Sequence, residues 1–242
     1  AQAATRFMNQ TGVNGNTIDD NGIAPDIYTT TAPERPCGHQ SVLAQASYAD
    51  WSALRHMSEL EYEKVCRGNR PAVANEHAWG TTVLQNTVFT FSNVGAANEV
   101  ITNPGTGAIA NYGGTNNFVF RGWRAGIAPA SFAGATRLQA SAGYYGVMDL
   151  TGNLMEMCVS VSNSEGRALT SSLHGDGALA ANGNSDIFSW PINLGTSIRL
   201  RGGAYSTPSV TPGVLRVSDR RSNPGSVSGT AGEFGIRLVR TL

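Results

Sequence analysis

One segment near the middle of the chain, residues 143–157, constrains the fold more than any other stretch. It reads GYYGVMDLTGNLMEM and combines two adjacent tyrosines, three glycines and two carboxylates. Glycines at this density predict turns, so aromatic and acidic side chains are brought together over a short length of chain. Two further blocks follow, LRGGAY at 200–205 and GIRLVR at 235–240. The order of these three blocks restricts the possible folds more than overall composition does.

Residues 39–51 predict the first of two helices in the N-terminal half of the chain. Apolar side chains recur there at helical spacing and are expected to share one buried face. The residues of this expected face are Val42, Leu43, Ala46 and Trp51.

A second helix is predicted to begin at Glu59. Ser58 and Glu61 form an S-x-x-E capping box, in which each residue satisfies a backbone N–H group at the start of a helix. Gly68 is the expected C-terminal stop, because glycine readily adopts the left-handed conformation that ends many helices. The stripe expected to face the core comprises Tyr62, Val65 and Cys66.

The rest of the chain is predicted to be loops with short strands. Residues 1–36 are rich in Asn, Gly, Thr and Pro and predict a loop-dominated lead-in with one or two short strands. Short β-prone runs lie between glycines from 81 to 142, and strands are expected again at 214–217 and 234–239. The 162–198 stretch is long and irregular, which is typical of functional loops or of an assembly surface.

Together these motifs resemble the formylglycine-generating-enzyme (sulfatase-modifying factor)-like family. Segment 58–68 retains most of a family helix motif, and 75–80 matches the family's Tyr/Ala-Trp-Gly element. The retained helix positions are Ser58, Glu59, Glu61, Tyr62, Glu63, Arg67 and Gly68. The resemblance implies an α+β, C-type lectin-like fold with two helices in the N-terminal half, short twisted antiparallel strands and much irregular loop. It predicts one domain over 37–242, preceded by a loop-rich arm over 1–36.

The resemblance also raises the question of catalysis. Formylglycine-generating enzymes oxidise a substrate cysteine with copper held by two cysteine thiolates, and a soft Cu(I) ion requires soft sulfur ligands. The matching positions here are Thr207 and Pro212, and proline has no side-chain donor atom. A related branch holds iron with histidines of an additional domain. The four histidines here lack HxxxH or HxE spacing: His39, His56, His77 and His174. We therefore expect a non-catalytic member without copper or iron.

A calcium site is the remaining candidate for metal chemistry. The residues that match the family's calcium-binding segment are Asp149, Gly152, Leu154 and Glu156. Calcium accepts six to eight oxygen ligands in flexible geometry, so two carboxylates and two backbone carbonyls from one turn suit it. Asp149 replaces an Asn of the family and retains an oxygen. An alternative stays open, in which Asp149 caps a turn and Glu156 pairs with Arg201 or Arg237.

A second calcium site of the family would use Asn111 and the carbonyl of Tyr112. Its expected acidic ligand falls at 136–139, where the sequence has no acid. We expect this second site to be lost.

Polar and sulfur-containing residues leave further alternatives open. The residues that recur in family motifs near the C-terminus are Arg201, Arg216, Asp219, Arg220 and Arg237. They form either a ligand-facing cluster or a buried Arg–Asp network that holds loops together. Cys158 lies in an apolar run and is predicted to be a core residue. Cys37 and Cys66 flank a helical region and either form a disulfide or remain free thiols.

Composition narrows the class of partner. The formal net charge is zero, so bulk electrostatics indicate neither a nucleic-acid nor a membrane-surface partner. The sequence contains no run of eighteen apolar residues, so it does not predict a membrane-spanning helix. Charged residues make up 14% of the chain, below the roughly 25% of ordinary soluble domains, and Lys64 is the only lysine. Such a surface suits an extracellular protein or a packed assembly. The resemblance, which extends to surface-associated bacterial proteins, implies an extracellular or cell-surface location in a bacterium.

Two functions remain in competition. The first is a non-catalytic binding and display domain that recognises a protein or glycan ligand through C-terminal loops, because loops on a rigid scaffold commonly carry recognition. Its expected surface resembles that of variable proteins of diversity-generating retroelements. The expected contact residues are Tyr205, Ser206, Thr207, Ser209, Val210, Thr211, Arg221, Ser222 and Asn223. The second function is a structural subunit of a surface appendage or filament, in contact with neighbouring subunits.

Overall fold

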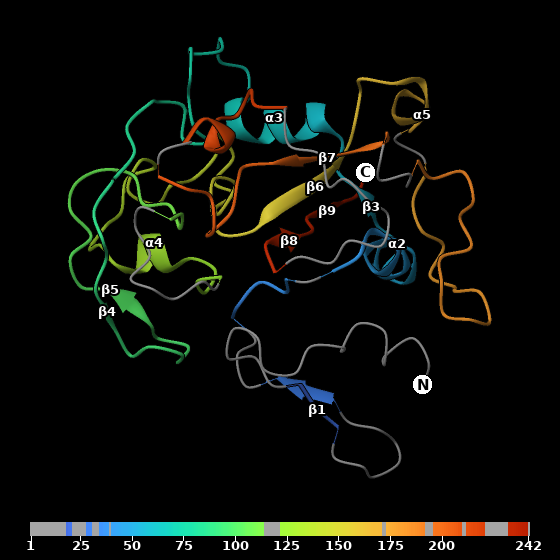
Figure 1. Cartoon of the computed structure of the whole chain (residues 1–242), viewed down its shortest axis with the longest axis horizontal. Coiled ribbons are helices and arrows are strands. Elements are labelled where there is room, and N and C mark those ends of the chain that lie inside the picture. The colour runs from blue at the N-terminus through green and yellow to red at the C-terminus, as the bar shows by residue number, and fades with distance from the viewer. Residues whose placement is uncertain are drawn as a thin grey trace.

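Short helices and strands joined by long irregular connections make up this α+β domain (Figure 1). The computed structural model describes residues 18–20, 28–30, 34–38, 40–113, 122–170, 173–191, 196–209, 212–220 and 232–241. The elements, in chain order, are β1 (Ile18–Asp20), β2 (Tyr28–Thr30), α2 (Val42–Trp51), β3 (Arg55–His56), α3 (Glu59–Arg67), β4 (Phe91–Ser92), β5 (Val100–Ile101), α4 (Ile127–Ala130), β6 (Met155–Val159), α5 (Ser164–Arg167), β7 (Ile198–Arg201), the 3-10 helix η1 (Pro212–Leu215), β8 (Phe234–Gly235) and β9 (Leu238–Val239).

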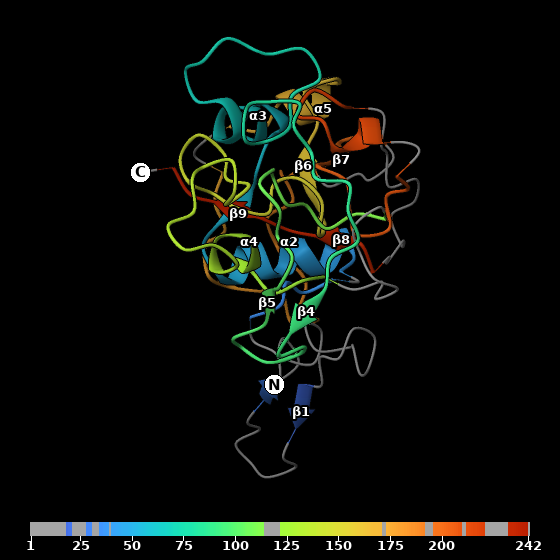
Figure 2. The same ribbon diagram turned by 90° about the vertical axis from the view of Figure 1, so that its left-hand side faces the viewer.

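A three-stranded sheet of order β7-β6-β8 forms the centre of the domain. β6 pairs antiparallel with β7 and parallel with β8. Figures 1 and 2 show this sheet between α3 on one side and α2 on the other. Successive side chains of a strand point to opposite faces. Cys158 accordingly packs in the cluster of Tyr62 on α3, whereas Met157 and Val159 pack with Val42 on α2. Both faces of β6 are therefore buried.

Helix α3 forms as its local sequence predicts. It begins at Glu59, where the Glu61 backbone N–H donates to Ser58 Oγ at 3.2 Å and the Ser58 backbone N–H donates to Glu61 Oε2 at 2.9 Å. The predicted stripe is confirmed at Tyr62 and Cys66, which are fully buried. Gly68 follows the helix at φ +66°, and a Cβ there would lie 2.2 Å from the Tyr144 ring. A left-handed backbone and a packed ring both require glycine at this position.

Helix α2 differs from its prediction in start and in face. It begins at Val42, capped by Ser41 Oγ, which accepts from the Ala44 backbone N–H at 3.1 Å. Val42 and Ala46 are buried as expected, but Leu43 and Trp51 are 44% and 55% exposed, so the expected four-residue face was wrong. The physical reason is that α2 is covered on two sides, by the sheet and by the 173–191 loop. Polar residues therefore also become buried: Gln45, Ser47 and Asp50.

The remaining short strands close the edges of the domain. β3 pairs antiparallel with β9, β4 with β5 and β1 with β2. Residues 214–217 were expected as a strand, but 214 and 215 instead belong to the 3-10 helix η1 and 216–217 to the turn after it. The strands expected at 234–239 are confirmed as β8 and β9. In Figure 2, β1 lies at the lower end, beyond β4 and β5. No helix within the described ranges is long and apolar enough to cross a membrane.

All three cysteines are free thiols, so Cys37 and Cys66 do not form a disulfide. Cys66 lies on the buried side of α3, whereas Cys37 is exposed ahead of α2 and its Sγ accepts from Gln40 Nε2 at 3.1 Å. The two residues flank α2 in sequence, but one faces the core and the other faces solvent. Cys158 is fully buried, as predicted.

Candidate functional site

A tight turn carries the predicted calcium segment into β6. Asp149, Gly152 and Asn153 all have positive φ angles of 60°, 76° and 68°. A Cβ at Gly152 would lie 2.5 Å from the carbonyl oxygen of Asn111, so this approach requires glycine. Asn153 secures the turn, because its Oδ1 accepts the Trp123 backbone N–H at 2.7 Å. Gly152 and Asn153 lie between Asp149 and Glu156 in the sequence, so the fixed backbone of this turn determines where the two carboxylates lie.

The two carboxylates and Leu154 line one cavity of about 160 Å³, together with Arg237. Asp149 Oδ2 accepts the Gly126 backbone N–H at 3.4 Å. Glu156 Oε1 lies 3.4 Å from Arg237 Nη2, whereas Glu156 Oε2 is buried with no hydrogen-bond partner among the described residues. Gly152 is not among the residues that line this cavity. Three of the four predicted ligands therefore come together.

Burial makes both carboxylates hard to ionise. It raises the pKa of Asp149 and raises the pKa of Glu156 to about 8, although the charge of Arg237 lowers both values. The charge of Asp149 raises the pKa of Glu156 further, so the two groups act on each other in the cavity. Two buried acids that share one arginine lack full charge compensation, and a buried charge is costly unless it is paired.

These residues fit a hard cation. Calcium binds carboxylate and carbonyl oxygens. Glu156 Oε2 is buried and accepts no hydrogen bond from a described residue, so no such bond competes with an ion for this oxygen. The two contacts observed here are those of the alternative interpretation, in which Asp149 accepts a turn N–H and Glu156 lies near Arg237. The weak 3.4 Å contact to Arg237 leaves Glu156 available to a metal ion.

The fold and this turn define the class of protein as an α+β domain of the formylglycine-generating-enzyme type. The sequence profile of the sulfatase-modifying factor enzyme 1-like domain matches residues 2–242, so the chain belongs to this family. A search of curated proteins finds no match to the chain.

The position that matches a copper-binding cysteine carries a structural residue. Thr207 is 3% exposed, and its Oγ1 accepts the Ala204 backbone N–H at 2.9 Å. Its carbonyl oxygen accepts the Gly113 backbone N–H at 2.8 Å, which ties two distant loops together. Pro212, at the other matching position, begins η1. Hydroxyl and pyrrolidine groups in these roles cannot supply the thiolates that Cu(I) requires.

The expected recognition surface divides into buried and exposed positions. Tyr205 and Thr207 are 6% and 3% exposed, so these two side chains support the loop from the interior rather than face a ligand. Ser206 is half-buried and donates to Glu233, whereas Ser209 is exposed. The other expected contact residues lie outside the described ranges: Val210, Thr211, Arg221, Ser222 and Asn223.

The C-terminal arginines form a buried ionic network with glutamates of α3. Arg201 Nη1 lies 2.7 Å from Glu59 Oε1, and its Nη2 lies 3.0 Å from Glu63 Oε1. Arg220 pairs with the same two glutamates. The sequence left two interpretations open, a ligand-facing cluster and a network that holds loops together. The contacts of Arg201 and Arg220 support the network. Its acids are glutamates of α3 that sequence reasoning assigned only to a helix motif.

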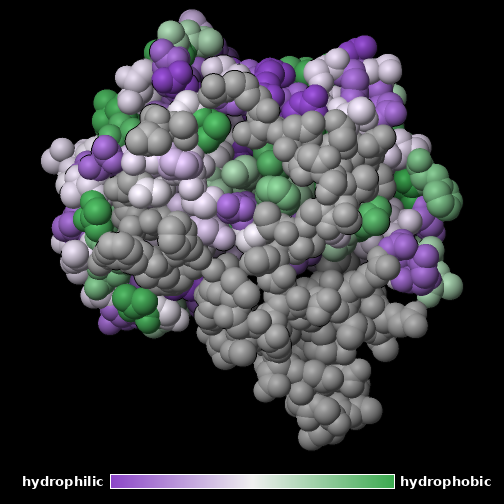
Figure 3. All heavy atoms as spheres, in the orientation of Figure 1, coloured by the Kyte–Doolittle hydropathy of each residue, from purple (hydrophilic) through white to green (hydrophobic). Residues whose placement is uncertain are grey.

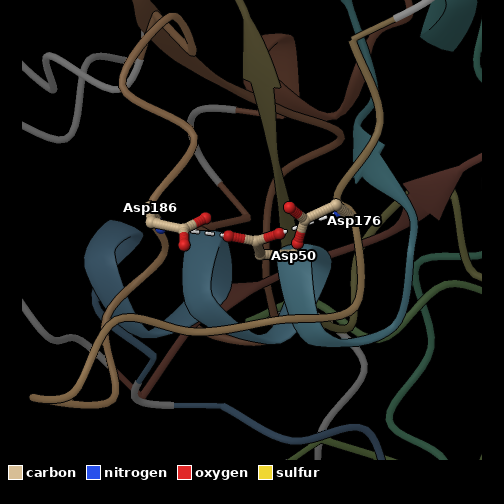
Figure 4. A group of neighbouring side chains, drawn as sticks. All are labelled: Asp50, Asp176 and Asp186. Carbon is tan, nitrogen blue, oxygen red and sulfur yellow. Dashed lines mark hydrogen bonds between the residues drawn. The ribbon is translucent and has the colours of Figure 1, made fainter.

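Sequence reasoning missed Asp50, which organises the 173–191 loop. Its carboxylate lies between Asp176 and Asp186, which makes these three the one acidic group of metal-binding size in the described part of the chain (Figure 4). The Asp50 oxygens, however, already accept the backbone N–H groups of Asp176 and Asp186, each at 3.1 Å. Ser185 Oγ donates to Asp50 at 2.7 Å. Asp50 is thus a loop anchor, and no sequence motif marks it.

The histidines do not converge on a metal in the described ranges. His56 is 2% exposed beside Trp190, with ring centroids 6.0 Å apart. His77 is buried and its Nδ1 lies 3.1 Å from the carbonyl oxygen of Leu215. His174 accepts the Thr241 backbone N–H at 2.8 Å. His39 lies outside the described residues. The three described histidines therefore have separate structural surroundings.

Proposed function

We propose that this chain is a non-catalytic binding and display domain of an extracellular or cell-surface bacterial protein. The observation that carries the proposal is Thr207, which is buried and closes a turn at a position where the family's oxidases hold copper. Buried polar anchors support the same function, because Asp50 and the Arg201 network hold long loops on a compact scaffold. Loops positioned in this way commonly present recognition residues.

The recognition surface proposed is the loop region after β7. Ser206 and Ser209 lie at its described surface, with Tyr205 and Thr207 beneath them as supports. A glycan or a protein loop is the ligand class that suits hydroxyl-bearing side chains without net charge, since hydroxyl groups both donate and accept hydrogen bonds.

An array of glycans and peptides tests this recognition surface. Ser209→Arg places a long charged side chain on the proposed surface and is expected to reduce ligand binding at least tenfold, about 1.4 kcal/mol. Val94→Arg is the matched control, because Val94 is 62% exposed on the β4–β5 connection. Equal binding by the two variants would place recognition elsewhere. Copper-dependent conversion of a cysteine peptide to formylglycine would refute the non-catalytic assignment.

Calcium is proposed to stabilise the turn that leads into β6. When bound, the ion would supply positive charge to Asp149 and Glu156, while the turn holds the two carboxylates at one cavity. A hundredfold excess of calcium over its Kd stabilises a protein by about 2.7 kcal/mol, or about 5–10 °C in Tm at this size. We expect this shift in the parent protein and its loss in Asp149→Ala/Glu156→Ala.

The matched control for the calcium experiment is Asp176→Ala/Asp186→Ala, which removes acids of the other acidic group. This control should keep the thermal shift caused by calcium, because its two carboxylates lie beside Asp50 and not at the cavity of Asp149 and Glu156. The Asp50 oxygens already accept backbone N–H groups. A parent without a thermal shift, or a shift lost only in the control, would show that the site is wrong.

A second function, a structural subunit of a surface appendage or filament, is favoured by one observation. Phe188 is 95% exposed on the 173–191 loop, and a neighbouring subunit that covered this side chain would remove its apolar surface from water.

A further inference from the structure

The two adjacent tyrosines ahead of β6, Tyr144 and Tyr145, lie in a tight turn. Two backbone hydrogen bonds close it: the Gly143 N–H donates to the Val147 carbonyl oxygen at 2.7 Å, and the Gly146 N–H donates to that of Gly143 at 3.1 Å. Gly146 has a φ of +82°, a conformation that favours glycine. The turn therefore holds both tyrosines on a fixed backbone.

The C-terminal end of α3 fixes one side of this turn. The last carbonyl groups of a helix have no partner within the helix and need donors from elsewhere. The Tyr144 N–H donates to the carbonyl oxygens of Val65 and Cys66, at 3.1 and 2.9 Å. Arg137 Nη2 also donates to the Cys66 carbonyl oxygen, at 3.2 Å. The end of α3 thus brings Tyr144 and Arg137 together.

Further hydrogen bonds hold the Arg137 guanidinium in place. Its Nε donates to the Ala142 carbonyl oxygen at 3.1 Å, and its Nη2 donates to that of Ala78 at 3.3 Å. Its Nη1 donates to no described residue and is not buried among them. A Cβ at position 80 would lie 3.6 Å from Nη1, so Gly80 leaves this nitrogen uncovered on one side. A fixed guanidinium with free N–H groups is ready to bind an acceptor.

A second arginine, Arg70, shares the Tyr144 ring with Arg137. The guanidinium carbons lie 5.6 Å (Arg70) and 5.8 Å (Arg137) from the centre of the ring. Each contact is a cation–π interaction, which holds a cation at the electron-rich ring. Burial lowers the pKa of Arg137, and the charge of Arg70 lowers it further. The two cations are therefore close enough to repel each other.

No described carboxylate compensates these two cations. Neither Arg70 nor Arg137 forms an ion pair with a described residue. Glu76 acts on the pKa of Arg137, but its carboxylate is already paired with Arg67. The net charge of the chain is zero, so this excess of positive charge is local. Two neighbouring like charges repel, and a bound anion would offset the repulsion.

Tyr145 adds an open aromatic ring beside the two cations. It is 57% exposed, and its ring stands at 81° to that of Tyr144, with centroids 4.9 Å apart. A Cβ at Gly146 would meet no atom within 4 Å, so the turn is uncrowded next to Tyr145. In Figure 3, hydrophilic residues line the upper edge of the molecule, where the connection that follows α3 lies in Figure 1. This part of the domain thus faces solvent.

We propose that Arg70, Arg137, Tyr144 and Tyr145, named here the Tyr144 site, bind a saccharide that carries a carboxylate, such as a uronic or sialic acid. The guanidinium groups pair with the carboxylate, whose two oxygens match the planar fork of an arginine. The Tyr145 ring packs against the C–H face of the same sugar, because the face of an aromatic ring is electron-rich. A neutral sugar would leave the two cations uncompensated.

The number of charges favours a sugar over larger anions. Nucleic acids are held through many phosphate contacts, commonly about six to ten, whereas this site offers two unpaired guanidinium groups. An acidic side chain of a peptide provides a carboxylate but no rigid apolar face for Tyr145. A pyranose ring combines both in one unit. The inference goes beyond the binding function proposed above, because it uses none of the loops after β7.

NMR titration with two acidic saccharides tests the Tyr144 site. The probes are the trisaccharide of galacturonic acid and sialyllactose, each compared with its methyl ester, which keeps the sugar and loses the charge. For a small exposed site we expect a Kd on the order of 1 mM. The acid should bind at least tenfold more tightly than its ester, and added salt should weaken it. Equal affinity of acid and ester, or binding of neither saccharide, would overturn the proposal.

Two variants separate the roles of charge and ring. Arg70→Gln should weaken binding of the acid at least tenfold and leave the ester unchanged. Tyr145→Ala should weaken both ligands and abolish the ring-current shifts of the sugar C–H protons. Both side chains are exposed, so the Tm should be unchanged. The matched controls are Arg240→Gln and Tyr48→Ala, an exposed arginine and a partly exposed tyrosine elsewhere, and equal losses in them would refute the site.

The Tyr144 site and the loops after β7 can fail independently. Ser209→Arg should leave binding of the acidic saccharides unchanged, and Arg70→Gln should leave binding by those loops unchanged. Loss of the acidic saccharides in Ser209→Arg would overturn the assignment to the Tyr144 site. Tighter binding of a single-stranded oligonucleotide or of a glutamate-rich peptide than of either saccharide would overturn the choice of a sugar.

Discussion

Replacement of Arg201 by Met is the sharpest test of what holds this domain together. The Arg201 side chain is fully buried and bonds to Glu59 and Glu63 of α3. Its guanidinium also lies 5.0 Å from the centre of the Tyr62 ring. Met retains the apolar stem of the side chain, so the change removes the charge and its hydrogen bonds with little loss of packing.

The expected cost follows from what remains around Glu59. Removal of one partner from a buried ion pair costs about 3–5 kcal/mol, because the other charge stays buried without compensation. Glu59 Oε2 keeps Ser160 Oγ and the Val161 backbone N–H, each at 3.1 Å, and Arg220 at 3.5 Å. These contacts place the expected loss at the lower end, about 3 kcal/mol. For a chain of 242 residues this corresponds to a Tm about 6–12 °C lower.

Urea denaturation and thermal unfolding of Arg201→Met measure this loss. The matched control is Arg199→Met on the same strand. Among the described residues, the partly exposed Arg199 side chain bonds only to the carbonyl oxygen of Ile198, at 2.9 Å. The control should change stability by less than about 0.5 kcal/mol. A second substitution, Glu59→Gln, should recover part of the loss in the double variant. A loss below about 1 kcal/mol for Arg201→Met would refute the network as a source of stability.

Two further predictions concern His56 and Asp50. Burial lowers the pKa of His56 to about 4, below its unfolded value of about 6.5. The unfolded chain thus binds the proton first, so stability is full above pH 6.5 and falls by up to about 3 kcal/mol as pH drops to 4. His56→Phe should flatten this part of the pH profile in urea titrations, and an unchanged slope would contradict the assignment. Asp50→Asn removes the charge that anchors the 173–191 loop and should cost about 1–3 kcal/mol. It should also speed proteolysis within that loop, whereas equal cleavage rates would exclude the anchor; Asp176→Asn, an exposed neighbour, is the control.

Local signals were sufficient for several elements of the fold. The capping box at Ser58 places α3 correctly because its hydrogen bonds join residues three apart, which any helix brings together. Gly68 and Gly152 likewise mark positive φ angles that a side chain would oppose. The family motif also indicated the turn that brings Asp149 and Glu156 to one cavity.

Other features depend on contacts that no local pattern contains. Leu43 and Trp51 have helical spacing but remain exposed, since a loop more than 120 residues later covers the face of α2 that carries Asp50. Tyr205 and Thr207 were expected at the surface, yet both are buried. Their backbones bond to distant segments, Tyr205 to Asn153 and Thr207 to Gly113. Whether a loop side chain faces solvent is decided by what packs over it.

The sequence by itself determined the family, the two central helices and the turn ahead of β6, because caps, glycines and short motifs act within a few residues. Only the tertiary structure decided which charges pair, as Arg201 meets Glu59 across 142 positions of the chain. It also brought Cys37, Gln45 and Ile236 together around one cavity and joined the 173–191 loop to Asp50 of α2. The physical reason is that burial and ion pairing depend on which distant segments share space, whereas helix capping and turn formation depend on the backbone near each residue.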